Sequence, residues 1–533
     1  MRYITHHIPA SLLALTLLLA SGCHGNVSTS EPAAESTSST MVTLRTSVIG
    51  SMTPRAVTES NAGPLAESGE GEVHVFNLWL AKEGWMQGVP DKTNAPIYQA
   101  TFKVNGVQNP AEERDYTILL NGHKLSLNTL SRSEETTIGL DQISLLMDDK
   151  GFTMTGAVNL SADIKPDVVT PARPGDNVFP KDEAHPVERV VSKAQLYKKS
   201  SGFTTGLPGT IANLHWAVAG SGNKVYLYRD HAGDRTMGDD GLYNELTTAS
   251  AESDLMKLSD VIKNTTDEGN FAWKVLSETA SEKKSVAGGI YFYEHALKEI
   301  KTKGQDNPYP RAIGYDKVTY AKVYADLGEI SKGKKIKDGA TPTEGAYTPA
   351  DLTTTTAADF SGDREYDVKV TKEWYDKMKP TLGDKLTEAD DVYRQHMVDK
   401  PGTFYVGSNG IIYNTLLAAM ADGNKSARKY TGGRMVYLTP LNAQRNDAGM
   451  IYNCDTRRNN IYDLEIQSLN GLGYNYDPVD ADDPYIPKPN DNPLEPDPEI
   501  PSINDTEITI KVMATVLNWN YIHQSYDLLG ETK

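Results

Sequence analysis

The stretch Thr506-Glu-Ile-Thr-Ile-Lys-Val-Met-Ala-Thr-Val516 alternates apolar residues with mostly polar ones. Alternation with a period of two places the apolar side chains on one face of a β-strand. A single strand is not stable by itself, so this one must pair with a sheet of its own chain or of another molecule. The apolar face changes after Val516, which predicts a bulge or a crossing between sheets. The residues expected to pack from this strand are Ile508, Ile510, Val512, Ala514, Val516, Leu517 and Trp519.

The segment before this strand has a different composition. Between Pro478 and Pro501 there are eight prolines interleaved with acidic residues. This composition predicts a stiff, charged spacer, roughly 75 Å long if fully extended, that takes no part in a core. Calcium prefers oxygen ligands such as these carboxylates, but the spacing of an ordered calcium loop is absent. We therefore interpret 477–505 as a linker and 506–533 as a terminal strand segment.

The body of the chain is predicted to be mainly β. Short apolar runs separated by turn signals, without a βαβ rhythm, favour β-sandwiches. The 28 Tyr against 9 Phe also fit half-exposed strands. We place a boundary near residue 207, which gives sandwiches at 56–207 and 208–476. Residues 187–197 are expected to form the closing strand of the first sandwich, and 373–382 and 387–398 are expected to be short helices.

The first residues have the features of an export signal. A weakly basic start and an apolar run too short to span a bilayer lead to Ala20-Ser-Gly-Cys23. This pattern is typical of a bacterial lipoprotein, in which Cys23 is acylated, for example with palmitate, and anchors the chain. We interpret 1–22 as the signal peptide; the alternative is an ordinary signal peptide with a chance cysteine. Cys454 is the other cysteine, so a disulfide scaffold is excluded.

A strand and an arginine follow the leader. Residues 41–50 alternate, and this places Val42, Leu44 and Val48 on one face. Arg55 and Ala56 come next, beside a proline and before a stretch rich in Gly, Ser, Asn and Glu. Proteases cut at exposed segments of this kind. The residues alone favour the simpler interpretation, a first strand followed by a loop.

Several classes of function are disfavoured. The formal net charge of -18 argues against a nucleic-acid partner, which needs a basic face. The body lacks the common nucleophile, phosphate-loop and zinc motifs, so we expect no enzyme, no cofactor and no metal. An acidic cluster in a Gly-rich loop is interpreted as a solvated turn: Asp230, Asp234, Asp239 and Asp240. An open alternative is a monomeric surface lipoprotein that binds a glycan or nutrient by stacking on Trp79, Trp85 and Trp216.

Several stretches together resemble a known family. They are Phe404–Tyr413, Arg457-Arg-Asn-Asn-Ile-Tyr462, Gly471–Pro478 before the acidic linker, and the final Val-Leu-Asn-Trp-Asn-Tyr521. The chain resembles the fimbrillins of Bacteroidetes, and most closely the shaft subunit of the short fimbriae of oral anaerobes. The resemblance covers nearly the whole chain and is strongest after Phe404, whereas 328–402 matches poorly.

The resemblance implies a fold and a function. The implied fold is two transthyretin-like β-sandwich domains with a few short helices and an extended C-terminal donor strand. The implied route is export through the periplasm to the outer membrane, cleavage by an arginine-specific protease between Arg55 and Ala56, and loss of the 23–55 propeptide. Arg45 is the rival cleavage site.

The implied assembly is head-to-tail. The donor strand of one copy fills the groove that the lost strand leaves in the next, and filaments form in cell-surface fimbriae that support adhesion, colonisation and virulence. The implied partners are further copies of the chain, tip and anchor subunits, the protease, and host or bacterial surface receptors. A tip or anchor subunit is the alternative within the same family.

Overall fold

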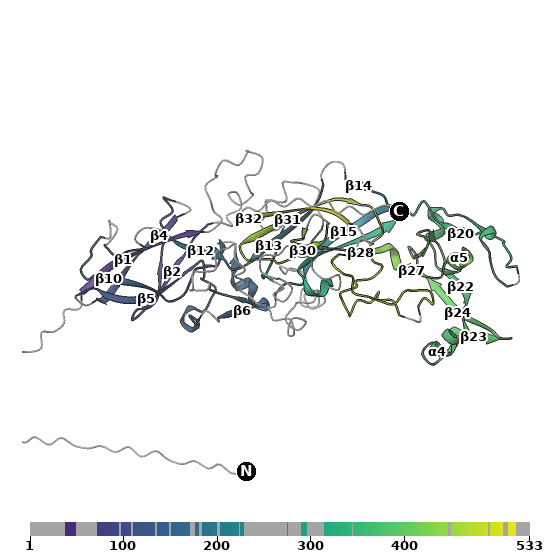
Figure 1. Cartoon of the computed structure of the whole chain (residues 1–533), viewed down its shortest axis with the longest axis horizontal. Coiled ribbons are helices and arrows are strands. Elements are labelled where there is room, and N and C mark those ends of the chain that lie inside the picture. The colour runs from purple at the N-terminus through teal and green to yellow at the C-terminus, as the bar shows by residue number, and fades with distance from the viewer. Residues whose placement is uncertain are drawn as a thin grey trace, which may run out of the picture.

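The computed structural model describes residues 38–48, 72–94, 97–107, 110–133, 136–148, 151–170, 176–180, 184–199, 203–222, 224–228, 274–275, 289–295, 314–343, 345–445, 449–488, 491–504 and 510–518. Over these residues the fold is mainly β, as predicted, with few short helices. The molecule is elongated, with one sheet at one end, two sheets in the middle and a small unit at the other end (Figure 1). The transthyretin-like detail and the domain boundaries stay predictions.

Within the described residues, the first sheet has nine strands and encloses the leading strand β1. Its core is formed by side chains such as Phe76, Phe102 and Ile118, together with residues of β1 itself. The strands are β1 (Ser38–Val48), β2 (Phe76–Leu80), β3 (Gly84–Gly88), β4 (Ile97–Val107), β5 (Glu112–Leu120), β9 (Met154–Thr155), β10 (Leu160–Ile164), β11 (Val178–Phe179) and β12 (His185–Arg189).

In the part of the chain that the structure describes, the middle of the molecule contains a five-stranded and a four-stranded sheet. Both contribute to one large core, for example through Trp216, Phe292 and Leu464. The five strands are β13 (Ser192–Lys198), β14 (Thr204–Thr205), β18 (Ile290–Phe292), β31 (Asn460–Leu469) and β32 (Ile510–Asn518). The four are β15 (Thr210–Ala219), β17 (Lys274–Val275), β19 (Tyr320–Gly328) and β28 (Arg434–Pro440).

The predicted single strand at 187–197 is two strands in two sheets. β12 ends at Arg189 in the first sheet, and β13 begins at Ser192 and pairs with β31 and β18 in the middle one. Val190 and Val191, which separate them, are both fully buried and belong to the middle core. The chain therefore passes from the first core to the middle core within two residues. Because both residues are apolar, the sequence pattern does not show where one strand ends and the next begins.

The unit at the far end has a core of its own, built around Val368, Tyr375 and Leu416. It contains α4 (Lys372–Leu382), as predicted, which begins where the Thr371 hydroxyl accepts a hydrogen bond from the Trp374 amide. Its other elements are α5 (Leu416–Ala421), β20 (Lys334–Ile336), β21 (Leu352–Thr354), β22 (Arg364–Lys369), β23 (Leu386–Ala389), β24 (Val392–Asp399), β25 (Phe404–Gly407), β26 (Ile412–Tyr413) and β27 (Ala427–Tyr430).

The predicted helix at 387–398 is wrong. This segment forms the antiparallel pair of β23 and β24, with a turn at Asp390 and Asp391, which both have positive φ. Along β24 every second side chain is buried, which is the period of a strand.

Short pairs and 3-10 turns complete the described part of the chain. The two-stranded sheets join β6 (Thr137–Gly139) to β16 (Lys224–Tyr226), β7 (Met147–Asp148) to β8 (Gly151–Phe152), and β29 (Gln444–Arg445) to β30 (Ile451–Asn453). The 3-10 turns are Leu127–Thr129, Leu140–Leu145, Tyr315–Lys317, Pro349–Asp351, Ala357–Phe360, Gly383–Lys385 and Thr431–Gly433. Among the described helices, none is long and apolar enough to cross a membrane.

The predicted free spacer at 477–505 is also wrong in one respect. The described residues 477–488 and 491–504 form no strand, but they lie against the body instead of extending away from it. Asp477 and Asp483 are buried, because each meets a basic side chain of the middle sheets. A buried carboxylate needs such a partner, and composition alone does not reveal one.

Candidate assembly sites at the terminal strands

The leading strand β1 is an interior strand of the first sheet. One edge pairs antiparallel with β4 from Ser38 to Ser47, and the other pairs in parallel with β11 and β12. Both rows of backbone hydrogen-bonding groups are therefore used by neighbouring strands. Removing β1 would leave two unpaired strand edges facing a groove.

The side chains predicted to face the core do so. Val42, Leu44 and Val48 are each 2% exposed or less and belong to the hydrophobic core of the first sheet. Thr40 and Thr46 lie in the same alternating row and are equally buried. The groove under β1 therefore has five inward positions at a period of two, three of them apolar.

Polar contacts fix the first half of β1. The Thr40 hydroxyl donates to the Lys165 carbonyl oxygen (2.8 Å) and accepts from the Val168 amide (3.0 Å) and the Asn177 side-chain amide (3.0 Å). The Met41 amide donates to the Val168 carbonyl at 2.7 Å. No local pattern could reveal these partners, because they lie more than a hundred residues from β1 along the chain.

A histidine lies beside the second half of β1. His185 of β12 is the register partner of Thr46, and its ring contacts the Tyr116 hydroxyl. Burial lowers the pKa of His185 to about 4. The His185 side chain of β12, which pairs with β1, is therefore neutral at pH 7.

The last strand, β32, pairs with the chain's own middle sheet. It runs antiparallel to β31, with Leu517 opposite Ile461 and Ile510 opposite Leu469. The register shift lies between Ile466 and Ser468 of β31, not after Val516, where a change of face was predicted. Val512, Ala514 and Val516 lie in the regular part of this register, opposite Ile466, Leu464 and Tyr462.

The remaining predicted site residues cannot be placed. Cys23, Arg55, Ala56, Ile508 and Trp519 lie outside the described residues, as do Asp230, Asp234, Asp239 and Asp240. Within the described ranges, no group of His, Cys, Asp or Glu side chains could hold a metal ion. Cys454 is buried.

A buried charge cluster joins the two sheets that carry β1 and β32. Arg458, directly before β31, pairs with Glu294 (2.7 Å) and lies 3.9 Å from Glu188 of β12. The Arg189 guanidinium of β12 donates to the Asn459 side-chain oxygen at 2.9 Å. The Arg-Arg-Asn-Asn-Ile-Tyr motif at 457–462 thus connects β12 to β31, whereas its partners Glu188 and Glu294 carried no sequence signal.

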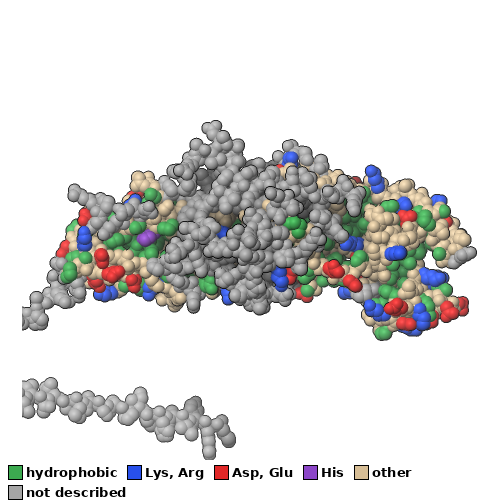
Figure 2. All heavy atoms as spheres, in the orientation of Figure 1, with side chains coloured by type: hydrophobic (Ala, Val, Ile, Leu, Met, Phe, Trp, Pro, Cys, Tyr) green, Lys and Arg blue, Asp and Glu red, His purple; other side chains and the backbone are tan. Residues whose placement is uncertain are grey.

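The three tryptophans of the alternative interpretation do not lie on one exposed surface. Trp216 is 1% exposed and lies in the middle core. Trp79 and Trp85 face each other as register partners of β2 and β3, and the Arg132 guanidinium lies 3.0 Å from the centre of the Trp79 ring. On the face of the molecule in Figure 2, acidic and basic side chains are interspersed over the described residues.

The fold is therefore that of a multi-sheet β protein with its first strand inside one sheet and its last strand on another. Residues 428–525 match the family model for the major fimbrial subunit protein type IV, fimbrillin, C-terminal. The match begins in β27 and includes β31 and β32. The predicted resemblance to fimbrillins is confirmed by this match over residues 428–525.

The chain also matches solved structures of proteins from Porphyromonas gingivalis and Parabacteroides distasonis, each at low sequence identity. A fimbrillin (FimA) of Porphyromonas gingivalis is 13% identical, with a TM-score of 0.35, over 91% of this chain and 99% of that chain. A candidate cell adhesion protein of Parabacteroides distasonis is 12% identical, with a TM-score of 0.38, over 91% and 98%. The C-terminally truncated tip fimbrial protein Mfa3 of P. gingivalis is 10% identical, with a TM-score of 0.25, over 68% and 99%.

Proposed function

We propose that this chain is the structural subunit of a fimbrial shaft. It is exported as a lipoprotein through Cys23, cut between Arg55 and Ala56 by an arginine-specific protease, and assembled head-to-tail by strand exchange. The observation that carries the proposal is the interior position of β1, which ends only seven residues before Arg55. A cut there separates an essential strand from the rest of its sheet.

Strand exchange supplies the energy for assembly. The vacated groove accepts a strand with apolar residues at a period of two, and the series from Ile508 to Val516 has that spacing. Burying four or five aliphatic side chains is worth on the order of 10 kcal/mol before ordering costs. Because donor and groove are different surfaces, the contact is open-ended and builds filaments.

The uncleaved chain is protected from early assembly. Its own β1 fills the groove, and its own β32 is paired with β31. Cleavage allows β1 to leave the groove. The open groove of one copy then competes with β31 of a neighbouring copy for the β32 strand of that neighbour. The partners are therefore further copies of the chain, together with tip and anchor subunits, in fimbriae at the cell surface.

A cleavage experiment tests the proposal. The chain without its leader and Cys23 is purified, treated with an arginine-specific protease and followed by size and by resistance to detergent. We expect a ladder of detergent-resistant multimers from the wild-type chain and from Arg45→Ala, and uncut monomer from Arg55→Ala. Monomer that persists after complete cutting would exclude a shaft subunit and favour a tip subunit or a monomeric receptor.

A further inference from the structure

The segment between the body and β32 is anchored first through Asp477. Its side chain and that of Lys322 in β19 are both fully buried, and they form an ion pair. The Tyr324 hydroxyl donates to the same carboxylate at 3.3 Å. Separating these groups would leave two uncompensated charges in the interior, so this anchor resists release.

The second anchor is Asp483. Its carboxylate pairs with the Arg434 guanidinium at 3.1 Å. The guanidinium lies over two rings, at 4.4 Å from the centre of Tyr324 and 4.2 Å from that of Tyr485. Tyr485 belongs to the segment itself, so the segment covers Arg434 with a carboxylate and an aromatic ring together.

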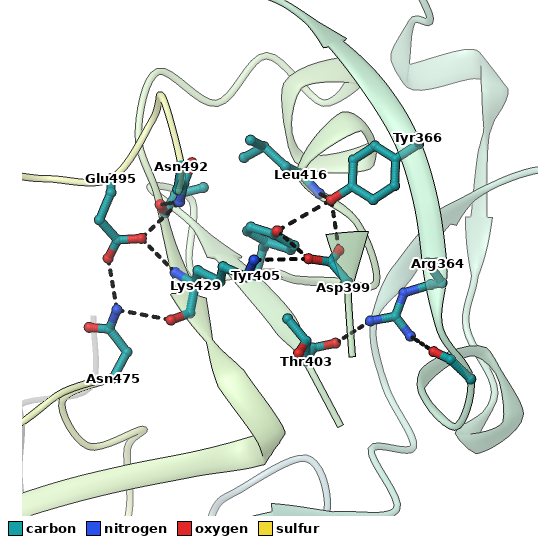
Figure 3. Close-up of polar contacts among 12 residues, drawn as sticks. Arg364, Tyr366, Asp399, Thr403, Tyr405, Leu416, Lys429, Asn475, Asn492 and Glu495 are labelled. Carbon is teal, nitrogen blue, oxygen red and sulfur yellow. Dashed lines mark hydrogen bonds and ion pairs between the residues drawn. The ribbon is translucent and has the colours of Figure 1, made fainter. Parts of the chain in front are cut away.

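The third anchor is Glu495 (Figure 3). Its carboxylate accepts hydrogen bonds from the Lys429 amide and from the side chains of Asn475 and Asn492, each at 2.8 Å. The Lys429 side chain in turn pairs with the buried Asp399 at 3.1 Å. The Ala427 amide donates to the Leu494 carbonyl at 2.9 Å, so the segment also pairs with the edge of β27.

The last anchors lie just before the end of the segment. The Tyr315 amide donates to the Pro501 carbonyl at 3.2 Å, and the Ile451 amide donates to the Asn504 side chain at 2.8 Å. Ile503 is 2% exposed and belongs to the middle core. The segment is therefore held at intervals along its whole length.

We infer that residues 477–504, the docked segment, stay on the body in the assembled fimbria, and that only the chain after Asn504 moves. This inference rests on the proposed strand exchange. The span from Asn504 to Ile510 reaches at most about 20 Å when fully extended, against about 100 Å if the docked segment were released. The neighbouring copy must then present the groove of its first sheet close to Asn504, which makes a short, stiff junction.

Hydrogen–deuterium exchange on multimers and uncleaved monomer tests this inference. The reporters are the peptides that carry the amides of Tyr315, Ala427, Lys429 and Ile451, which the docked segment holds. We expect their exchange to be unchanged within about threefold on assembly, while peptides of β31 exchange faster because β32 has left. A rise of about a hundredfold at the four reporters would overturn the inference.

A matched pair of variants shows whether hydrogen–deuterium exchange at the Lys429 amide reports on the docked segment. Glu495→Ala removes the acceptor of the Lys429 amide and should speed exchange there in the monomer, whereas Glu499→Ala alters an exposed acid of the same segment and should not. Two outcomes count against the proposed function instead: no multimers after cleavage, or multimers in which β31 keeps its protection. Both also remove the premise of the inference.

Discussion

At the scale of single residues, two histidines stay neutral in the fold: His185 beside β1, and His295, which follows β18 and pairs with Thr456 in the middle of the molecule. Burial lowers the pKa of His185 and of His295 to about 4 each. In the unfolded chain these groups take up a proton near pH 6.5. Their contribution to stability is therefore full above that pH and is lost as the pH falls towards 4.

We predict that the uncleaved protein loses stability on acidification and that His185→Gln removes part of this loss. For one histidine the effect between pH 7 and pH 4 is up to about 3 kcal/mol. Urea unfolding at a series of pH values measures it. The control is Gln87→Ala, a non-titratable change at an exposed position of β3 in the same sheet, which should leave the pH dependence as in the wild type. An unchanged pH dependence in His185→Gln would contradict the prediction.

At the scale of elements, the proposed mechanism requires β1 in the uncleaved chain and dispenses with it after cleavage. We predict that Leu44→Ala lowers the free energy of unfolding of the uncleaved protein by about 2–5 kcal/mol, because a fully buried side chain is truncated. The cleaved multimers should be as resistant to heat as wild-type ones, because they no longer contain Leu44. Ser39→Ala, at an exposed position of the same strand, is the control.

The Leu44→Ala substitution also shows whether β1 leaves the first sheet on cleavage or stays in it. If the multimers of Leu44→Ala melt earlier than those of the wild type, the leading strand has stayed in the sheet, and strand exchange at this groove is excluded. If both proteins form equally resistant multimers, another strand fills the groove.

The sequence predicted those elements whose buried residues are apolar and regularly spaced. β1 has that pattern and was predicted correctly. β24 was not, because its buried row alternates Tyr393 and Met397 with the polar residues Gln395 and Asp399. Asp399 is tolerated there because it accepts hydrogen bonds from Tyr366 and Tyr405, which no local pattern shows.

Long-range pairing explains the other features that the sequence did not predict. Asp477 and its partner Lys322 are 155 residues apart, and Arg189 and Asn459 are 270 apart. An acidic, proline-rich stretch has the composition of a free spacer until such partners are known. The candidate assembly strands, in contrast, were visible in the sequence, because alternation is a local property.

At the scale of the whole molecule, the proposed mechanism separates two functions that can be removed independently. A chain that ends at Asn504 keeps the docked segment and, once cut after Arg55, has a groove but no donor strand. Arg55→Ala in the full-length chain keeps the donor strand but not a free groove. Each protein should stay monomeric alone, and near-ultraviolet circular dichroism should show that each is folded.

We predict that mixing the two, after the protease has been removed, gives a one-to-one complex and nothing longer. A donor-only copy fills the groove of an acceptor-only copy, and neither free end can continue the chain, because head-to-tail contacts join different surfaces. Light scattering coupled to size exclusion gives the mass. If the contact were symmetric, the same surface of two identical copies would meet, and one of the two proteins would pair with itself. Homodimers of either protein would therefore exclude head-to-tail exchange, even if the wild-type chain forms multimers.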